Sequence, residues 1–277
     1  MASSPERNDR KRGKPERFHS RKPGGPAHPR GPGERGGADW LWGWHAVIAA
    51  LENPRRGPPR RLLATADRAK TLTERFGRIA TLEILEPKAI DAALAIGAVH
   101  QGVALKPEPL EPLSIDELAG DDGGFILMLD QVTDPQNVGA IFRSAAAFGA
   151  RGVIIQDRHA PALTGALAKA AAGAVDAVPY ARVTNLSRAL EQLADLGWRA
   201  VGLSGAADEA LEAVLDSRPT VLVLGSEGEG IRRLVSEHCD ALGRIPMPGG
   251  FESLNVSAAA AIALYEVSRA RNFSVKE

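Results

Sequence analysis

The sequence is poor in cysteine, with Cys239 as its single thiol. No intramolecular disulfide can form, so cysteine usage gives no indication of a secreted, disulfide-stabilised fold. Cys239 lies in the stretch 231–241, where apolar residues recur with helical spacing. This pattern predicts a helix and a buried or partly buried structural thiol rather than a nucleophile.

Long apolar runs are also absent. The longest strongly apolar run, 258–265, is far shorter than the ~20 residues that a membrane span needs. No apolar run near the N-terminus has the character of a signal peptide. We therefore expect a cytoplasmic protein with no membrane partner. Clusters of Cys and His with metal-ligand spacing are missing too, so no metal site is predicted.

The formal net charge is zero, but the charges are distributed unevenly. Residues 1–38 contain ten Lys and Arg against four Asp and Glu, a balance of +6, and the rest of the chain carries −6. The first 38 residues have almost no large apolar side chains, so burial cannot offset their ordering entropy. The pattern predicts a disordered basic tail, either a solubilising extension or an arm that contacts RNA phosphates.

The rest of the 277-residue chain divides into two predicted domains and a linker. Residues 39–106 read as a small α/β unit, with helices at 45–51 and 87–96 and strands at 61–64, 83–85 and 102–105. Residues 107–124 hold three prolines, six acids and three glycines, so we predict a linker over 107–122. Residues 123–277 form the second domain.

The second domain alternates short β-branched runs with amphipathic stretches. This is typical of a mostly parallel sheet covered by helices, whose ligand site lies beyond the carboxyl ends of the strands. The predicted strands are 125–129, 152–156, 174–178, 200–203, 220–224 and 244–246, and the predicted helices are 138–148, 162–172, 186–196, 211–215, 231–241 and 254–271.

The segment 129–144 interrupts this alternation after the first strand. It turns at Asp134-Pro135, and a helix opens near Asn137, followed by Gly139, which permits a close approach by another backbone or a ligand. Arg143 lies in an otherwise apolar helix, where burying it without an anionic partner is costly. It is either a structural arginine paired with an Asp or a phosphate-facing or catalytic one.

The segment 221–231 runs from an apolar strand into a glycine-dense loop. Its glycines at 225, 228 and 230 match neither the Gly-x-Gly-x-x-Gly fingerprint nor the phosphate loop. Backbone groups in such a loop can approach a flat ligand closely. Glu227 either caps the following helix or serves the site.

The segment 245–261 stops at prolines, turns at Gly249-Gly250 and enters an alanine-rich helix. Ser253 is a candidate cap for this helix, and Asn255 follows near its opening. The small side chains allow close packing of the helix.

In residues, order and spacing, the three segments together resemble the three signature motifs of the SpoU (TrmH) family in the SPOUT superfamily of RNA methyltransferases. The resemblance covers roughly the last 150 residues. It implies an α/β fold with a parallel sheet and a C-terminal trefoil knot, a homodimer, and S-adenosylmethionine as cofactor. The implied reaction is methylation of an RNA ribose 2'-OH.

The N-terminal unit adds a second resemblance. Residues 42–51 and 99–103 are similar to the substrate-binding domain of the bacterial 23S ribosomal RNA guanosine-2'-O-methyltransferases, an L30e-like domain. This implies 23S rRNA as the partner and a guanosine as the target. The side chain of Trp44 is bulkier than the one expected at this position of the family motif. His45 and His100 are interpreted as structural residues rather than RNA contacts.

The family resemblance also assigns roles to single residues. A guanidinium is normally protonated, so Arg143 either loses its proton in the site or stabilises developing negative charge. Asn137 would orient Arg143 or the ribose, and Glu227 would hold the polar network, with Arg143 as a candidate partner. The remaining expected site residues are Ser253 and Asn255, for positioning the nucleotide, and Gly225, Ile245 and Leu254, for lining the cofactor pocket.

Three other functions fit the sequence less well. A tRNA ribose methyltransferase of the same family shares the chemistry, but the N-terminal unit argues against it. A non-catalytic RNA-binding protein with a degenerate knot is disfavoured by the complete set of polar residues. A dinucleotide-binding α/β enzyme is disfavoured because its glycine fingerprint is missing.

Overall fold

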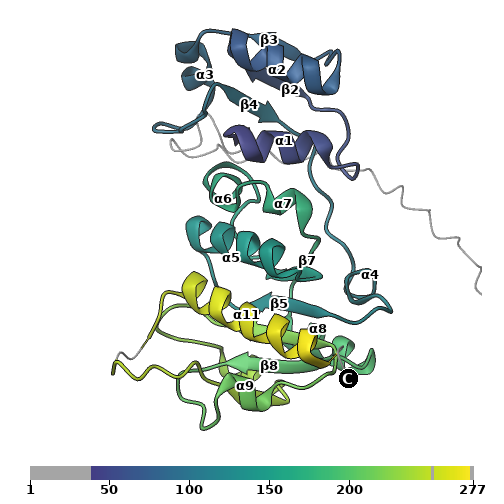
Figure 1. Cartoon of the computed structure of the whole chain (residues 1–277), viewed down its shortest axis with the longest axis vertical. Helices are drawn as coiled ribbons and strands as arrows, with labels where there is room; N and C mark the ends of the chain where they lie inside the picture. The colour runs from purple at the N-terminus through teal and green to yellow at the C-terminus, as the bar shows by residue number, and fades with distance from the viewer. Residues whose placement is uncertain (1–38, 251–252, 275–277) are drawn as a thin grey trace, which may run out of the picture. The chain divides into compact units, whose positions relative to one another are not determined.

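A computed structural model describes residues 39–250 and 253–274, and the predicted basic tail, 1–38, lies outside this part. The described residues build two sheets that belong to one compact unit (Figure 1). None of the helices in the described part is long and apolar enough to cross a membrane.

The first sheet has four strands in the order β1-β4-β2-β3, of which β2 and β3 are parallel. Its strands and helices are β1 (Leu41–Trp42), α1 (Trp44–Glu52), β2 (Arg61–Ala64), α2 (Ala66–Phe76), β3 (Leu82–Ile84), α3 (Pro87–Ala93) and β4 (Val103–Lys106). The predicted helix 45–51 and strand 61–64 are confirmed, whereas α2 and β1 were not predicted. The sheet is small, and its apolar strands are buried between α1 and α2 on one side and α3 on the other.

The second sheet has six parallel strands in the order β10-β8-β9-β5-β6-β7. Its strands are β5 (Phe125–Leu129), β6 (Gly152–Gln156), β7 (Tyr180–Val183), β8 (Arg199–Leu203), β9 (Thr220–Leu224) and β10 (Ala241–Gly243). Its helices are α5 (Pro135–Phe148), α6 (Gly165–Ala171), α7 (Ala174–Ala177), α8 (Leu186–Asp195), α9 (Leu211–Val214), α10 (Arg233–Ser236) and α11 (Val256–Ser274). The predicted parallel α/β sheet is therefore confirmed.

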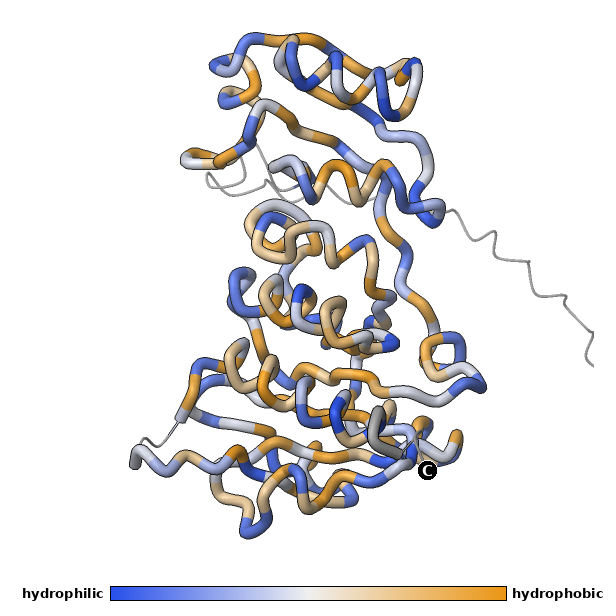
Figure 2. Tube along the Cα trace, in the orientation of Figure 1, coloured by the Kyte–Doolittle hydropathy of each residue, from blue (hydrophilic) through white to orange (hydrophobic). Residues whose placement is uncertain are grey.

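Helices cover both faces of the six-stranded sheet because its central strands are apolar on both sides (Figure 2). Side chains alternate along a strand, so Phe125, Leu127 and Leu129 face α5 and α11. Ile126 and Met128 point to the opposite face and pack with α8. Two continuous apolar cores result, and the carboxyl ends of the strands are left for polar loops.

Three predicted elements are wrong in type or position. The predicted strand 174–178 is the helix α7, and the strand begins after it, at Tyr180. The predicted strand 244–246 is displaced to Ala241–Gly243, and the helix predicted over 231–241 is reduced to Arg233–Ser236. The alternation in Ala174-Val-Asp-Ala-Val resembles a strand, but Ala174 and Val175 are buried in the core shared with α5, and this tertiary packing overrides the local pattern.

The segment predicted as a linker is packed rather than extended into solvent. It contains α4 (Ile115–Ala119), which begins with a capping box between Ser114 and Glu117. Leu110 and Leu118 are buried, and the amide of Leu113 donates to the carbonyl of Tyr180 at 2.8 Å. The proline- and acid-rich composition concealed the apolar positions that anchor this segment.

We expect Cys239 to react slowly with thiol reagents in the folded protein. Burial raises the pKa of this thiol to about 12, so at pH 8 roughly one molecule in 10⁴ carries the reactive thiolate. The rate of labelling by an aromatic disulfide should rise steeply on denaturation. Fast labelling of the native protein at pH 8 would contradict a structural thiol.

Candidate active site

A polar network joins the three segments that interrupt the sheet-and-helix pattern. Asn137 on α5 donates through Nδ2 to Glu227 Oε1 at 3.1 Å, and Asn255 Nδ2 donates to the same oxygen at 2.7 Å. Asn255 Nδ2 also donates to Asn137 Oδ1 at 2.9 Å, and the amide of Val256 donates to Glu227 Oε1 at 3.2 Å. One carboxylate thus collects three donors, although the three segments lie far apart in the sequence.

The start of α5 explains why Asn137 is available for this network. Asp134 caps the helix by accepting from the amide of Asn137 at 2.8 Å, and Pro135 occupies the first helical position. The helix therefore opens at Pro135, and the Asn137 side chain is free to reach Glu227.

The start of α11 corrects the expectation that Ser253 caps this helix. Asn255, rather than Ser253, caps this helix, because its Oδ1 accepts from the amides of Ser257 at 3.0 Å and Ala258 at 3.3 Å. Asn255 therefore has two tasks. Its oxygen satisfies the helix terminus, and its amide nitrogen holds Glu227. Ser253 lies on the neighbouring cavity instead.

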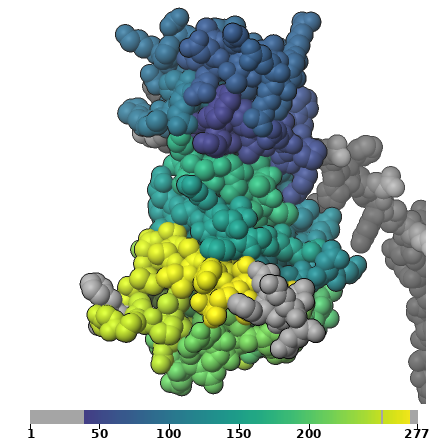
Figure 3. Space-filling view, viewed as in Figure 1, coloured from purple at the N-terminus to yellow at the C-terminus, as the bar shows by residue number. Residues whose placement is uncertain are grey.

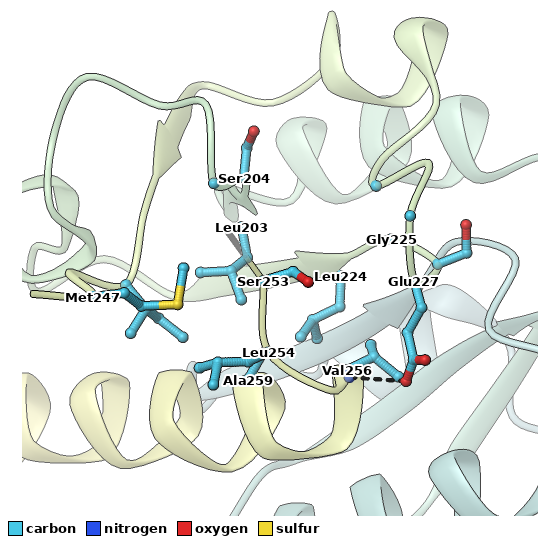
Figure 4. A pocket seen from close by; sticks show the side chains of 15 residues that line it. Leu203, Ser204, Leu224, Gly225, Glu227, Met247, Ser253, Leu254, Val256 and Ala259 are labelled. Atoms are coloured by element: carbon cyan, nitrogen blue, oxygen red, sulfur yellow. Dashed lines mark hydrogen bonds between the residues drawn. The ribbon is translucent and has the colours of Figure 1, made fainter. Parts of the chain in front are cut away.

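A cavity of about 250 Å³ opens beside the network at the carboxyl ends of β8 and β9 (Figure 4). Leu203, Leu224 and Val256 give it apolar walls, and Glu227 lies at one side with its carboxylate on the Val256 amide. All three residues expected to line a cofactor pocket contribute to it, namely Gly225, Ile245 and Leu254. Ser253 and Glu227, expected for other roles, also lie on its wall.

The glycine-dense loop is closed on itself at the cavity wall. The amide of Ser226 donates to the carbonyl of Gly230 at 3.2 Å, and the reverse bond measures 3.0 Å. A Cβ atom on Gly225 would overlap the backbone of Gly230 and Ile231. Glycine is therefore required at 225 by the loop's own backbone, whereas the sequence alone suggested that it makes room for a ligand.

A buried carboxylate that the sequence did not reveal supports this loop. Asp130, fully buried directly after β5, accepts from the amide and the Nε of Arg232, each at 2.8 Å. Its own amide donates to the carbonyl of Leu224 at 2.8 Å. Arg232 also donates to Gln156 at 3.3 Å, at the end of β6. An acid immediately after an all-apolar strand was the available signal, because only a paired carboxylate is stable there.

Arg143 lies apart from the network. On α5 it is separated from Asn137 by roughly 9 Å along the axis and roughly 120° around it. Its side chain is exposed, as are Ala146 and Ala147, so the apparently apolar surroundings are a surface of small residues. Within residues 39–250 and 253–274 it forms no ion pair, and Glu227 bonds instead to Asn137 and Asn255. Of the two alternatives that the sequence left open, the structural arginine paired with an Asp is therefore not what the described residues show.

Gly139 was expected to permit a close approach by either another backbone or a ligand, and the structure shows which of the two applies. A Cβ at this position would lie 2.5 Å from the carbonyl oxygen of Leu167 and 2.7 Å from the Cβ of Ala170. The glycine therefore admits the backbone of α6 against α5, rather than a ligand.

Comparison with known proteins places these features in a family. Residues 124–265 match the SpoU rRNA methylase family, and residues 40–113 match a family described as RNA 2'-O ribose methyltransferase substrate binding. The chain is 41% identical over 231 residues to an uncharacterized tRNA/rRNA methyltransferase of Mycobacterium avium, covering 80% of this chain and 75% of that protein. It is 37% identical over 244 residues to the putative TrmH family tRNA/rRNA methyltransferase YacO of Bacillus subtilis, covering 84% and 96%.

A solved structure agrees with this assignment. The SpoU methyltransferase AviRb of Streptomyces viridochromogenes, crystallised with the cofactor AdoMet, superimposes with a TM-score of 0.71 and is 26% identical. The match covers 84% of this chain and 90% of that one. By two family matches, these relatives and this structural likeness, the chain belongs to the SpoU family of RNA methyltransferases.

Proposed function

We propose that this protein transfers a methyl group from S-adenosylmethionine to the ribose 2'-OH of a guanosine in 23S ribosomal RNA. The observation that carries the proposal is the meeting of three sequence segments in one site. Asn137, Glu227 and Asn255 are hydrogen-bonded to one another beside a cavity at the carboxyl edge of the parallel sheet. This edge is where α/β sheets bind their ligands.

The cavity residues suit S-adenosylmethionine. Leu203, Leu224, Ile245 and Met247 supply apolar walls for an adenine, and the loop around Gly225 supplies backbone donors and acceptors. When bound, the cofactor supplies an electrophilic methyl group on a positively charged sulfur. Family membership and the AdoMet complex of AviRb support this choice of donor.

The reaction needs few protein groups. In the proposed reaction the ribose oxygen would take the methyl group as its bond to sulfur breaks, S-adenosylhomocysteine would leave, and the hydroxyl proton would pass to solvent. Asn137 and Asn255 hold Glu227, and together they present a fixed polar surface for the nucleotide next to Ser253. Arg143 binds the adjacent phosphate or stabilises the negative charge that develops on the ribose oxygen.

We further propose that Arg143 acts at the site of a second copy in a homodimer. Arg143 points to solvent on α5, away from the network of its own chain. α5 lies beside α11 (Figure 3). α11 exposes Ile262 and Tyr265, and Tyr265 meets Phe148 of α5 edge to face. We infer that a second copy covers these exposed apolar side chains, and a two-fold dimer would then bring each Arg143 toward the other copy.

The knot and the N-terminal domain are proposed from the same family resemblance. A C-terminal trefoil knot would thread the chain after β9, where the Gly225 loop already lies against its own backbone. The unit 39–106 would be an L30e-like RNA-binding domain, and the basic tail, 1–38, an electrostatic arm for RNA phosphates. We place the protein in the cytoplasm, where its RNA substrate is made.

Ribosomal RNA is the preferred target over tRNA because of the N-terminal unit. Residues 40–113 match a substrate-binding family in addition to the catalytic one. A separate recognition unit is a physical way to present one ribose among many to the active site. The names of the relatives cover both tRNA and rRNA, so tRNA is the alternative substrate.

The decisive experiment is a map of ribose methylation in 23S rRNA and tRNA from cells with and without the gene. We expect one 23S guanosine to lose its 2'-O-methyl group and to regain it when the purified protein and S-adenosylmethionine are added. Loss of a tRNA methyl group instead would transfer the protein to the alternative. Unchanged maps of both RNAs would contradict the proposed reaction.

A further inference from the structure

An ion pair is buried between the two sheets of the molecule. Arg56, in the loop after α1, pairs with Asp176 on α7, and their side chains are only 4% and 3% exposed. Arg56 also donates through Nη1 to the carbonyl of Glu108 at 2.7 Å, and Asn53 Nδ2 donates to Asp176 Oδ1 at 3.0 Å. Charges removed from water in this way are stable only when every partner is in place.

The surfaces around this pair fit at backbone distance. A Cβ on Gly173, which precedes α7, would lie 2.9 Å from the Cβ of Ala49 and 3.0 Å from the carbonyl oxygen of His45. The amide of Gly165 donates to the carbonyl of Trp40 at 2.9 Å, and its missing side chain makes room for Trp42. Ala168 of α6 is buried in the apolar core of the first sheet. The contact is therefore closely packed at these two glycines.

The same helices lie against the helix of the candidate active site. α6 and α7 both pack on α5, and the contact between α5 and α6 is close enough to require Gly139. α5 carries Asn137 and Arg143. A continuous set of packed elements thus leads from the first sheet through α6 and α7 to the site, although the sequence suggested two units joined by a linker.

We propose that the Arg56–Asp176 pair is a positioning device, which locks the RNA-recognition unit to the catalytic sheet and so sets which ribose reaches the active site. The proposal rests on the proposed function, because it assigns RNA recognition to residues 40–113. With the two units locked, the distance from the recognised RNA element to Asn137 is constant. A ribose at another distance is then excluded by geometry rather than by chemistry.

The locking is testable without RNA. Spin labels on Glu74→Cys in α2 and Asp195→Cys in α8, in a full-length Cys239→Ala background, report the distance between the units. We expect one narrow distance distribution in this parent. Arg56→Met and Asp176→Leu should each broaden it, because each leaves one buried charge unpaired, and the double variant should narrow it again. Arg61→Met, which breaks an exposed pair with Glu83, is the matched control.

A broad distribution in the parent, or single variants as narrow as the parent, would overturn the locking. S-adenosylmethionine affinity, measured by calorimetry, must stay at the parental value in every variant, which shows that the catalytic sheet remains folded. The label distances do not depend on which RNA is modified, so this part stands even if the proposed reaction fails.

The positioning role is tested by product mapping on 23S RNA. We expect each single variant to lose at least ~10-fold in kcat/KM at the target ribose and to methylate neighbouring riboses. The double variant should recover both rate and site fidelity, and Arg61→Met should match the parent. Single variants that unlock the units yet keep parental fidelity would show that the pair is structural only.

Discussion

Replacing Arg143 with alanine is expected to reduce methyl transfer by about 10²–10³-fold while leaving S-adenosylmethionine affinity unchanged. A fixed cation that meets negative charge developing in the transition state contributes an effect of this size. The substitution removes an exposed side chain that contacts neither the cavity nor the Asn137–Glu227–Asn255 network. Single-turnover methylation and calorimetry with the cofactor measure the two quantities.

Arg188→Ala is the matched control for this experiment. Arg188 is likewise an exposed helical arginine, but it lies on α8, on the opposite face of the sheet, so turnover should stay at the parental rate. If Arg143→Ala retained near-normal turnover, Arg143 would not be the activating residue.

Mixing two inactive variants tests whether Arg143 acts across the dimer. In a random mixture of Arg143→Ala and Glu227→Ala subunits, a site built from both chains is intact in about a quarter of all positions. Activity should therefore reappear at about a quarter of the parental level once the subunits have exchanged. No recovery, with subunit exchange demonstrated, would place Arg143 in the site of its own chain.

Replacing Gly225 with valine is expected to weaken S-adenosylmethionine binding by ~100-fold or more and to lower the free energy of unfolding. The added side chain would overlap the backbone of Gly230 and Ile231, so the loop that forms one wall of the cavity must open. Overpacking of this kind costs about 1–3 kcal/mol before any effect on binding is counted.

Gly57→Val serves as the comparison, because a Cβ there meets only the flexible side chain of Glu108 at ordinary contact distance. Its cofactor affinity and melting temperature should match those of the parent. If Gly225→Val bound the cofactor normally by calorimetry, neither the loop nor the cavity would have the role assigned to it.

The sequence was sufficient for the residues that meet in the network. Asn137, Glu227 and Asn255 each follow a predicted strand or open a predicted helix, and carboxyl ends of parallel strands must converge at one edge. The sequence did not predict which of these polar groups form hydrogen bonds with each other. Glu227 bonds to two asparagines rather than to Arg143, and Asn255 rather than Ser253 caps α11.

The exposure of the Arg143 side chain to solvent also could not be predicted from the sequence. Alanine is tolerated both in a core and on a surface. A helix rich in alanine therefore gives no sequence signal for which of its faces is buried. Only the packing of α5 on α6 and α11 decides which of its faces is free, and that packing depends on residues distant in the chain.

The sequence by itself therefore determined the parallel α/β architecture, the family and the three site segments, because periodicity and motif spacing are local properties. The tertiary structure alone decided the burial of Asp130 with Arg232, the closed loop at Gly225 and the Arg56–Asp176 pair between the sheets. These features join residues about 100 positions apart or require backbones in contact. A charge or a glycine acquires such a role only through the partners that folding brings to it.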